Sequence, residues 1–142
     1  MSRDLNDLDP DVRDKAHMLL LAAASAGINL IIDQTYRTFD EQHILYEQGR
    51  SLPGNIVTYS PPGYSWHNWR RAFDVVFETP DGGVSWDGDW ELLGTLGEHV
   101  GLEWGGRWKV PDRPHFEDRG GLTLNELRQA HPNGLPPTTT IV

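Results

Sequence analysis

The chain has 142 residues, with 12 basic and 21 acidic side chains and a formal net charge of −9. This length favours one domain with its own hydrophobic core. The sequence contains no cysteine, which excludes disulfides, thiolate metal sites and cysteine nucleophiles. The acidic balance argues against nucleic-acid binding, which requires a basic face that neutralises phosphates.

The first predicted elements are a helix and a buried strand. Asp9-Pro10 is typical of a helix start, and Gly27 stands where a helix-ending glycine is expected. Between them, apolar residues recur at helical spacing: Val12, Ala16, Leu19, Leu20 and Ala23. Residues 28–32 are apolar and rich in β-branched side chains, which predicts a strand.

A second helix and a second strand are predicted in the middle of the chain. Thr38 and Glu41 form a capping box, which opens a helix that ends near Gly49. Residues 52–64 contain several prolines and glycines and are expected to form a long loop. Residues 72–77 form an apolar run that predicts a strand.

The remaining predicted elements are short. A turn over 80–83 returns the chain as a hairpin through Val84, and a helix runs from Asp89 to about Val100. Strands are expected near 102–104 and 115–117, and a capping box of Thr123 and Glu126 opens the last helix. Helices and antiparallel strands alternate without regular βαβ units, so we expect an α+β fold with a small antiparallel sheet flanked by helices. Residues 1–130 would form a single compact domain, and residues 131–142, which are rich in Pro and Thr, a loose C-terminal tail.

Two histidines and an aspartate form a candidate metal site. His67, Asp74 and His115 would supply three ligands to a catalytic zinc ion and leave a fourth position for water. Asp74 and His115 both lie in apolar strands, where an unpaired polar group is costly. An ion pair of Asp74 with Arg70 or Arg71 would also offset the cost of burying its carboxylate. The spacing alone therefore leaves both a metal site and a structural ion pair open.

Four segments resemble, in order, the signatures of the LAS-type zinc peptidases of peptidoglycan, which include VanY-like D,D-carboxypeptidases and phage L-alanyl-D-glutamate endolysins. The first contains Tyr36-Arg37-Thr38, Glu41-Gln42 and Leu45-Tyr46, and the second, residues 65–74, is similar to SxHxxGxAxD. The others are Glu103-Trp104-Gly105-Gly106 and Asp112-Arg113-Pro114-His115. The resemblance covers residues 27–117 and departs from the pattern at Arg70, where the family usually has Gly.

The resemblance implies a fold like that of hedgehog and D-Ala-D-Ala peptidases, with one Zn²⁺ in a cleft on the sheet. The ion would be bound by His67, Asp74 and His115. Asp112 would be the general base and Arg37 would hold the substrate carbonyl or the developing oxyanion. Ser65 would hydrogen-bond the substrate or a ligand.

The family resemblance also implies the reaction. The expected activity is hydrolysis of the peptidoglycan stem peptide at the L-alanyl-D-glutamate bond, by a phage or prophage endolysin. The alternatives are a D-Ala-D-Ala carboxypeptidase and an inert, zinc-stabilised wall-binding module.

Several residues admit a second interpretation. Glu103 and Glu117 are rival bases to Asp112, and Arg37 would make a surface salt bridge if it lay near Asp33 or Asp40. Gln42 is expected to support the cleft.

Six tryptophans are many for this length. Trp66 and Trp104 are equally consistent with a wall of the substrate groove and with a position in the core, because Trp buries a large area. Trp69 and Trp108 lie near the proposed site in sequence, whereas Trp86 and Trp90 are expected in the core. The acidic cluster of Asp81, Asp87 and Asp89 is interpreted as turn and cap residues, with calcium binding as the alternative.

The polar, acidic segment 1–14 lacks the pattern of a secretory signal, and the apolar run 18–24 is far shorter than the roughly 20 residues that span a bilayer. We therefore expect a protein made in the cytoplasm, without membrane insertion. The family resemblance implies that it acts on the wall after release, and we expect a monomer.

Overall fold

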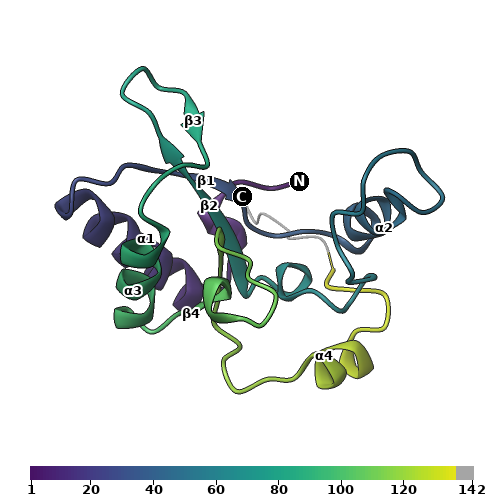
Figure 1. Cartoon of the computed structure of the whole chain (residues 1–142). Helices are drawn as coiled ribbons and strands as arrows, with labels where there is room; N and C mark the ends of the chain where they lie inside the picture. The colour runs from purple at the N-terminus through teal and green to yellow at the C-terminus, as the bar shows by residue number, and fades with distance from the viewer. Residues whose placement is uncertain (137–142) are drawn as a thin grey trace, which may run out of the picture.

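An antiparallel sheet forms the centre of the computed structural model, which describes residues 1–136 (Figure 1). Within this range its strands are β1 (Leu30–Gln34), β2 (Ala72–Glu78), β3 (Val84–Ser85), β4 (Glu103–Trp104) and β5 (His115–Glu117). The strand order is β1-β2-β5-β4, and β3 pairs with the end of β2 as a hairpin. Every pairing between these strands is antiparallel. The predicted α+β class is confirmed.

The main core lies between one face of this sheet and two helices, α1 (Pro10–Ser25) and α3 (Trp90–His99), which lie together at the left of Figure 1. Strand β2 supplies Phe73, Val75 and Phe77 to it, because alternate residues of a strand point to one face. Phe73 and Phe116 stack with ring centroids 5.7 Å apart. Burial of each such side chain stabilises the fold by about 1.5–3 kcal/mol.

The opposite face of the sheet carries a second, smaller cluster around Trp66, Trp69 and Ala72. Helices α2 (Phe39–Glu47) and α4 (Leu124–Ala130) lie on this side (Figure 1), and their apolar residues pack against the cluster. Asp74 lies between Phe73 and Val75 in β2 and therefore points away from the main core. The candidate metal residues thus lie on the less covered face.

The predicted helices are confirmed, with local differences in how they begin. The capping box of Thr38 and Glu41 is complete. Thr123 accepts the Glu126 N–H, but the Glu126 carboxylate binds the Thr123 hydroxyl instead of the backbone. Asp9 precedes α1 without a side-chain cap bond, because its carboxylate binds the buried Arg71.

Strand β1 begins two residues later than predicted. The Ile28 N–H donates to the carbonyl of Ala23, so Ile28 closes the end of α1 instead of starting the strand. Gly27 has the left-handed φ of +80° that this helix ending requires.

In the described part of the chain, three short 3-10 helices connect the larger elements: η1 (Leu5–Asp7), η2 (Trp66–Trp69) and η3 (Gly105–Arg107). η2 ends at Arg70, a non-glycine residue with φ of +62°. A left-handed backbone at this point explains why a glycine would suit it. The Arg70 side chain contacts Tyr36 and the Asp7 carbonyl and does not line the cleft described below.

Part of the predicted tail packs on the body of the molecule. Leu135 contacts the second apolar cluster, and the ring of His131 lies near that of Trp69. Residues 137–142 lie outside the described part, and the boundary at residue 130 stays a prediction. Within residues 1–136, no helix has the length and apolar character needed to cross a membrane.

Candidate metal centre and cleft

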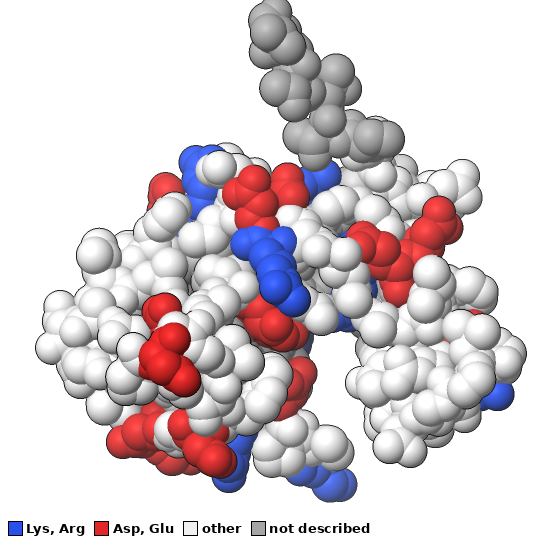
Figure 2. All heavy atoms as spheres, turned by 90° about the horizontal axis from the view of Figure 1, so that it is seen from above, with Lys and Arg blue, Asp and Glu red and all other residues white. Residues whose placement is uncertain are grey.

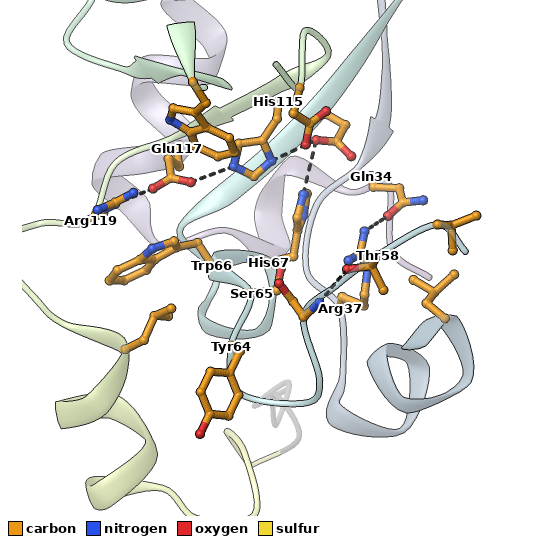
Figure 3. Close-up of a pocket in the computed structure, with 17 residues that line it drawn as sticks. Gln34, Arg37, Thr58, Tyr64, Ser65, Trp66, His67, His115, Glu117 and Arg119 are labelled. Atoms are coloured by element: carbon orange, nitrogen blue, oxygen red, sulfur yellow. Dashed lines mark hydrogen bonds and ion pairs between the residues drawn. The ribbon is translucent and has the colours of Figure 1, made fainter. Parts of the chain in front are cut away.

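The three predicted ligand residues converge, although 41 positions separate Asp74 from His115. Asp74 in β2 and His115 in β5 are cross-strand partners, and His67 reaches the same point from η2. Asp74 Oδ1 lies 3.2 Å from both His67 Nε2 and His115 Nδ1 (Figure 3). One ligand atom from each residue lies within 4.8 Å of the other two. This separation allows a single cation to contact all three.

Each imidazole is held in place through its other nitrogen. His67 Nδ1 lies 2.8 Å from the Thr35 carbonyl oxygen, so it donates there and leaves Nε2 free to act as a ligand. His115 Nε2 lies 2.8 Å from the carboxylate of Glu117, which in turn accepts from Arg119. Metal-binding histidines typically have such outer partners. The donor set of two neutral nitrogens and one carboxylate fits a catalytic zinc ion.

The charges at this centre favour a cation. Burial alone would raise the pKa of Asp74, but the neighbouring imidazoles His67 and His115 hold it far below its usual range. Burial alone would lower the pKa of His115, but hydrogen bonds to Asp74 and Glu117 raise it to about 10. Two carboxylates therefore stabilise positive charge here, so a metal ion would bind in competition with protons.

A cleft of about 480 Å³ opens over the centre. Figure 2 shows the surface hollowed between the lobe that carries α2, at the right, and the rest of the molecule. The triad lines this cleft together with polar, aromatic and aliphatic residues, among them Gln34, Arg37, Leu45, Val57, Thr58, Tyr64, Ser65, Trp66, Trp108, Asp112, Arg119 and Leu124. A peptide with both polar and apolar groups fits such a lining.

Arg37 lines the cleft and is 9% exposed, so it is not the surface residue of the alternative interpretation. Its guanidinium donates to Gln42 Oε1 at 2.9 Å and to Gln34 Oε1. Burial lowers the pKa of Arg37, and the nearby Asp74 opposes this. The guanidinium of Arg37 therefore places a positive charge beside the three candidate metal ligands.

Asp112 lies at the mouth of the cleft on the segment before β5. Loss of hydration within the cleft raises the pKa of its carboxyl group, while the nearby His115 opposes this. Both rival carboxylates are occupied by other hydrogen bonds, although Glu117 also lines the cleft. Glu117 binds His115 and Arg119, and Glu103 binds Arg119 and Trp108 outside the cleft lining.

The other predicted site residues divide into two groups. Ser65 and Trp66 line the cleft, and the Ser65 hydroxyl accepts the His67 N–H at 3.3 Å. Gln42 is fully buried behind Arg37. Trp104 lies in the main core, where its indole donates to the Arg113 carbonyl.

The remaining tryptophans also differ from one another. Trp108 lines the cleft with its ring centroid 5.1 Å from that of His115. Trp69 belongs to the second apolar cluster. Trp90 is buried as predicted. The prediction that Trp86 lies in the core is wrong: it follows directly after strand β3 and is 54% exposed. In the acidic cluster, Asp81 and Asp89 bond to nearby backbone N–H groups, as turn and cap residues do.

Sequence reasoning missed residues that act behind the site. Thr35 positions His67, and Gln34 binds Arg37. Asn68 is fully buried and joins the cleft elements, because its amide donates to the Arg37 carbonyl and accepts from the Gly63 N–H. Asn68 adjoins His67 in sequence, and this was the one available signal.

A small antiparallel sheet with two histidines and an aspartate gathered on one face is the arrangement of a zinc peptidase. The family model of VanY, described as D-alanyl-D-alanine carboxypeptidase, matches residues 5–86. A second family model with the same description, for M15 peptidases, matches residues 58–118. The chain belongs to the VanY family, and the predicted membership among zinc metallopeptidases that act on peptidoglycan is confirmed.

Individual relatives agree with this assignment. The chain is 41% identical over 123 residues to the peptidoglycan L-alanyl-D-glutamate endopeptidase CwlK of Bacillus subtilis (strain 168), covering 79% of this chain and 74% of CwlK. The crystal structure of the L-Ala D-Glu endopeptidase ChiX of Serratia marcescens matches with a TM-score of 0.62 and 25% identity, over 86% of this chain and 85% of ChiX. The D,D-pentapeptidase VanY in complex with Zn(II) shares the fold, with a TM-score of 0.61 and 16% identity over 86% of this chain and 78% of VanY.

Proposed function

We propose that this protein is a zinc-dependent endopeptidase that hydrolyses the L-alanyl-D-glutamate bond in the stem peptide of bacterial peptidoglycan. The observation that carries the proposal is the convergence of His67, Asp74 and His115 beneath a cleft that also contains Asp112 and Arg37. The similarity to CwlK supports the choice of bond.

In this proposal His67 Nε2, His115 Nδ1 and an oxygen of Asp74 would hold the zinc ion. Zinc bound there would supply Lewis-acid chemistry, polarising the substrate carbonyl and lowering the pKa of a water molecule to near neutral pH. Thr35 and Glu117 keep the two imidazole rings oriented through their outer nitrogens. The protein supplies this geometry before substrate arrives.

Asp112 and Arg37 act on the reacting atoms. Asp112 accepts a proton from the attacking water and later gives one to the amine of the D-glutamyl leaving group. Arg37 places positive charge beside the carbonyl oxygen, where negative charge develops during attack. Ser65 and Trp66 line the cleft, where they would contact the stem peptide. Gln42 contributes through Arg37, and Trp104 is left out because it lies in the core.

A second candidate is a D-Ala-D-Ala carboxypeptidase, which the description of both family models favours. The two activities would use the same ligands and differ in the cleft walls, here formed by segments 57–66 and 108–112. A wall-binding module without catalysis is less consistent with an aspartate that shares the cleft with the triad. We also propose that the protein acts at the cell wall as a monomer and binds no nucleic acid.

The test is digestion of purified peptidoglycan with and without a zinc chelator, with new amino termini identified by mass spectrometry. We expect N-terminal D-glutamate, loss of cleavage with chelator, and recovery on addition of zinc. Release of free D-alanine would instead identify a carboxypeptidase, and zinc binding without any product would identify a binding module. His67→Ala is expected to lose zinc and cleavage, whereas His99→Ala, on the exposed end of α3, is the matched control.

A further inference from the structure

The guanidinium of Arg37 is held from two sides by neutral amides. Nη1 donates to Gln42 Oε1. Nη2 donates to Gln34 Oε1 (Figure 3). The Nε atom is buried and has no hydrogen-bond partner within residues 1–136. Across the same described range, no ion pair joins Arg37 to a carboxylate. A buried arginine is usually paired with a carboxylate, so hydrogen bonds to neutral amides alone are unusual.

Gln34 reaches this position because of an irregularity in strand β1. Ile32 pairs with Val75, so regular pairing would place Asp33 opposite Asp74. The register shifts between Ile32 and Gln34, and Gln34 becomes the partner of Asp74. Cross-strand partners share a face of the sheet. The shift therefore places an amide, and not another carboxylate, next to the triad and Arg37.

Gln42 is fixed in a matching orientation from helix α2. Its Nε2 donates to the Ser60 carbonyl at 2.7 Å, so its Oε1 must face Arg37. Gln42 is fully buried and cannot rotate its amide without losing both bonds. Arg37 is thus positioned by a strand on one side and a helix on the other.

Neutral partners orient the guanidinium without cancelling its charge. A carboxylate at the same place would form an ion pair with Arg37 and reduce the positive potential in the cleft. We infer that Gln34 is a positioning residue that keeps Arg37 oriented without a direct ion pair, so that its charge acts on the substrate carbonyl. This inference rests on the proposed function, in which Arg37 stabilises the developing oxyanion.

The test compares two substitutions of Gln34 in steady-state hydrolysis of a soluble stem peptide. Gln34→Glu keeps the size and adds a charge, and we expect kcat to fall about 10- to 100-fold with a smaller change in KM, because loss of an oxyanion contact typically costs 10²–10³-fold. The bound zinc and the melting temperature should equal or exceed those of the parent, since an ion pair with Arg37 is gained. Gln34→Met removes the acceptor without adding charge, and its loss of kcat is expected to be smaller.

Two controls separate the effect on Arg37 from other effects. Gln129→Glu adds the same charge on the exposed part of α4 and is expected to leave kcat at the parent value. In an Arg37→Met background, neither Gln34 substitution should lower kcat further, because the residue through which Gln34 acts is gone.

The outcomes distinguish this inference from the proposed function. An active parent combined with Gln34→Glu at the parent kcat would overturn the inference alone. Equal losses in Gln34→Glu and Gln34→Met, or a loss that persists with Arg37→Met, would also overturn it. If Gln34→Glu does not fold, Gln34→Met measured with and without Arg37→Met still tests whether Gln34 acts on kcat through Arg37. A zinc-loaded parent that releases no product overturns both.

Discussion

Replacement of Glu117 by glutamine tests whether the carboxylate behind His115 controls metal affinity. Glu117 is 1% exposed and accepts a hydrogen bond from His115 Nε2 at 2.8 Å. Glutamine keeps an oxygen that can accept this bond but removes the negative charge that makes the imidazole a stronger ligand. The substitution leaves His67, Asp74 and Asp112 unchanged, so its effect should pass through His115.

The expected magnitude follows from the role of such outer partners. Their loss typically weakens metal affinity 10- to 100-fold, or about 1.4–2.7 kcal/mol. Glu117→Gln retains the hydrogen bond and should fall near the lower value, about 10-fold. Glu117→Ala removes both the charge and the bond, and should approach the upper value, about 100-fold.

The assay is zinc competition against a chromophoric chelator at fixed pH, with the dissociation constant as the measured quantity. Glu103→Gln is the matched control, because Glu103 also binds Arg119 but does not contact His115. We expect its zinc affinity to equal that of the parent. The reasoning is refuted if Glu117→Gln and Glu117→Ala both bind zinc as tightly as Glu103→Gln.

Other predictions concern catalysis and stability. Asp112→Asn should retain zinc but lower kcat by about 10²–10⁴-fold in the peptide assay, because the proton acceptor is lost; a parent rate would exclude Asp112 as the base. Arg71→Met should lower the free energy of unfolding at pH 7 by about 2 kcal/mol in urea, since the buried Arg71 binds Asp11 and a backbone carbonyl. The bond with Arg71 lowers the pKa of Asp11, so its stabilisation is present above about pH 4 and is lost as the pH falls through the folded pKa; the difference between variant and parent should shrink at pH 3, and an unchanged difference would contradict this. Gly94→Ala should lower the melting temperature and cost about 1–3 kcal/mol, because its Cβ would lie 2.2 Å from the Trp104 ring; an unchanged melting temperature would show that the ring can move.

Local chemistry in the sequence was sufficient to predict most elements. The capping box of Thr38 and Glu41 and the glycine at position 27 depend on residues close in sequence, and they fix where helices begin and end. The start of β1 was misplaced because Ile28 is used to close α1, which apolar composition does not reveal.

The candidate metal ligands were predicted because four ordered segments resemble the signatures of zinc peptidases, whereas their spacing alone left a second interpretation open. Their supporting partners were not predicted. Thr35 acts through a backbone carbonyl, which any residue could supply. The position of Gln34 depends on a register shift in β1 that no local sequence pattern predicts. Trp104 could not be separated from Trp66 by sequence, since both flank the site and only packing distinguishes them.

The paired strands β2 and β5 contribute both to the hydrophobic core and to the candidate metal site. Phe73 and Phe116 meet on one side of this pair, and Asp74 and His115 meet on the other, one residue along. A cation held by Asp74 and His115 would fasten the same two strands that the aromatic stack holds from behind. The zinc concentration would then determine the conformational stability of the enzyme as well as its activity. At a cell wall poor in zinc, the enzyme would be inactive and would also unfold more readily.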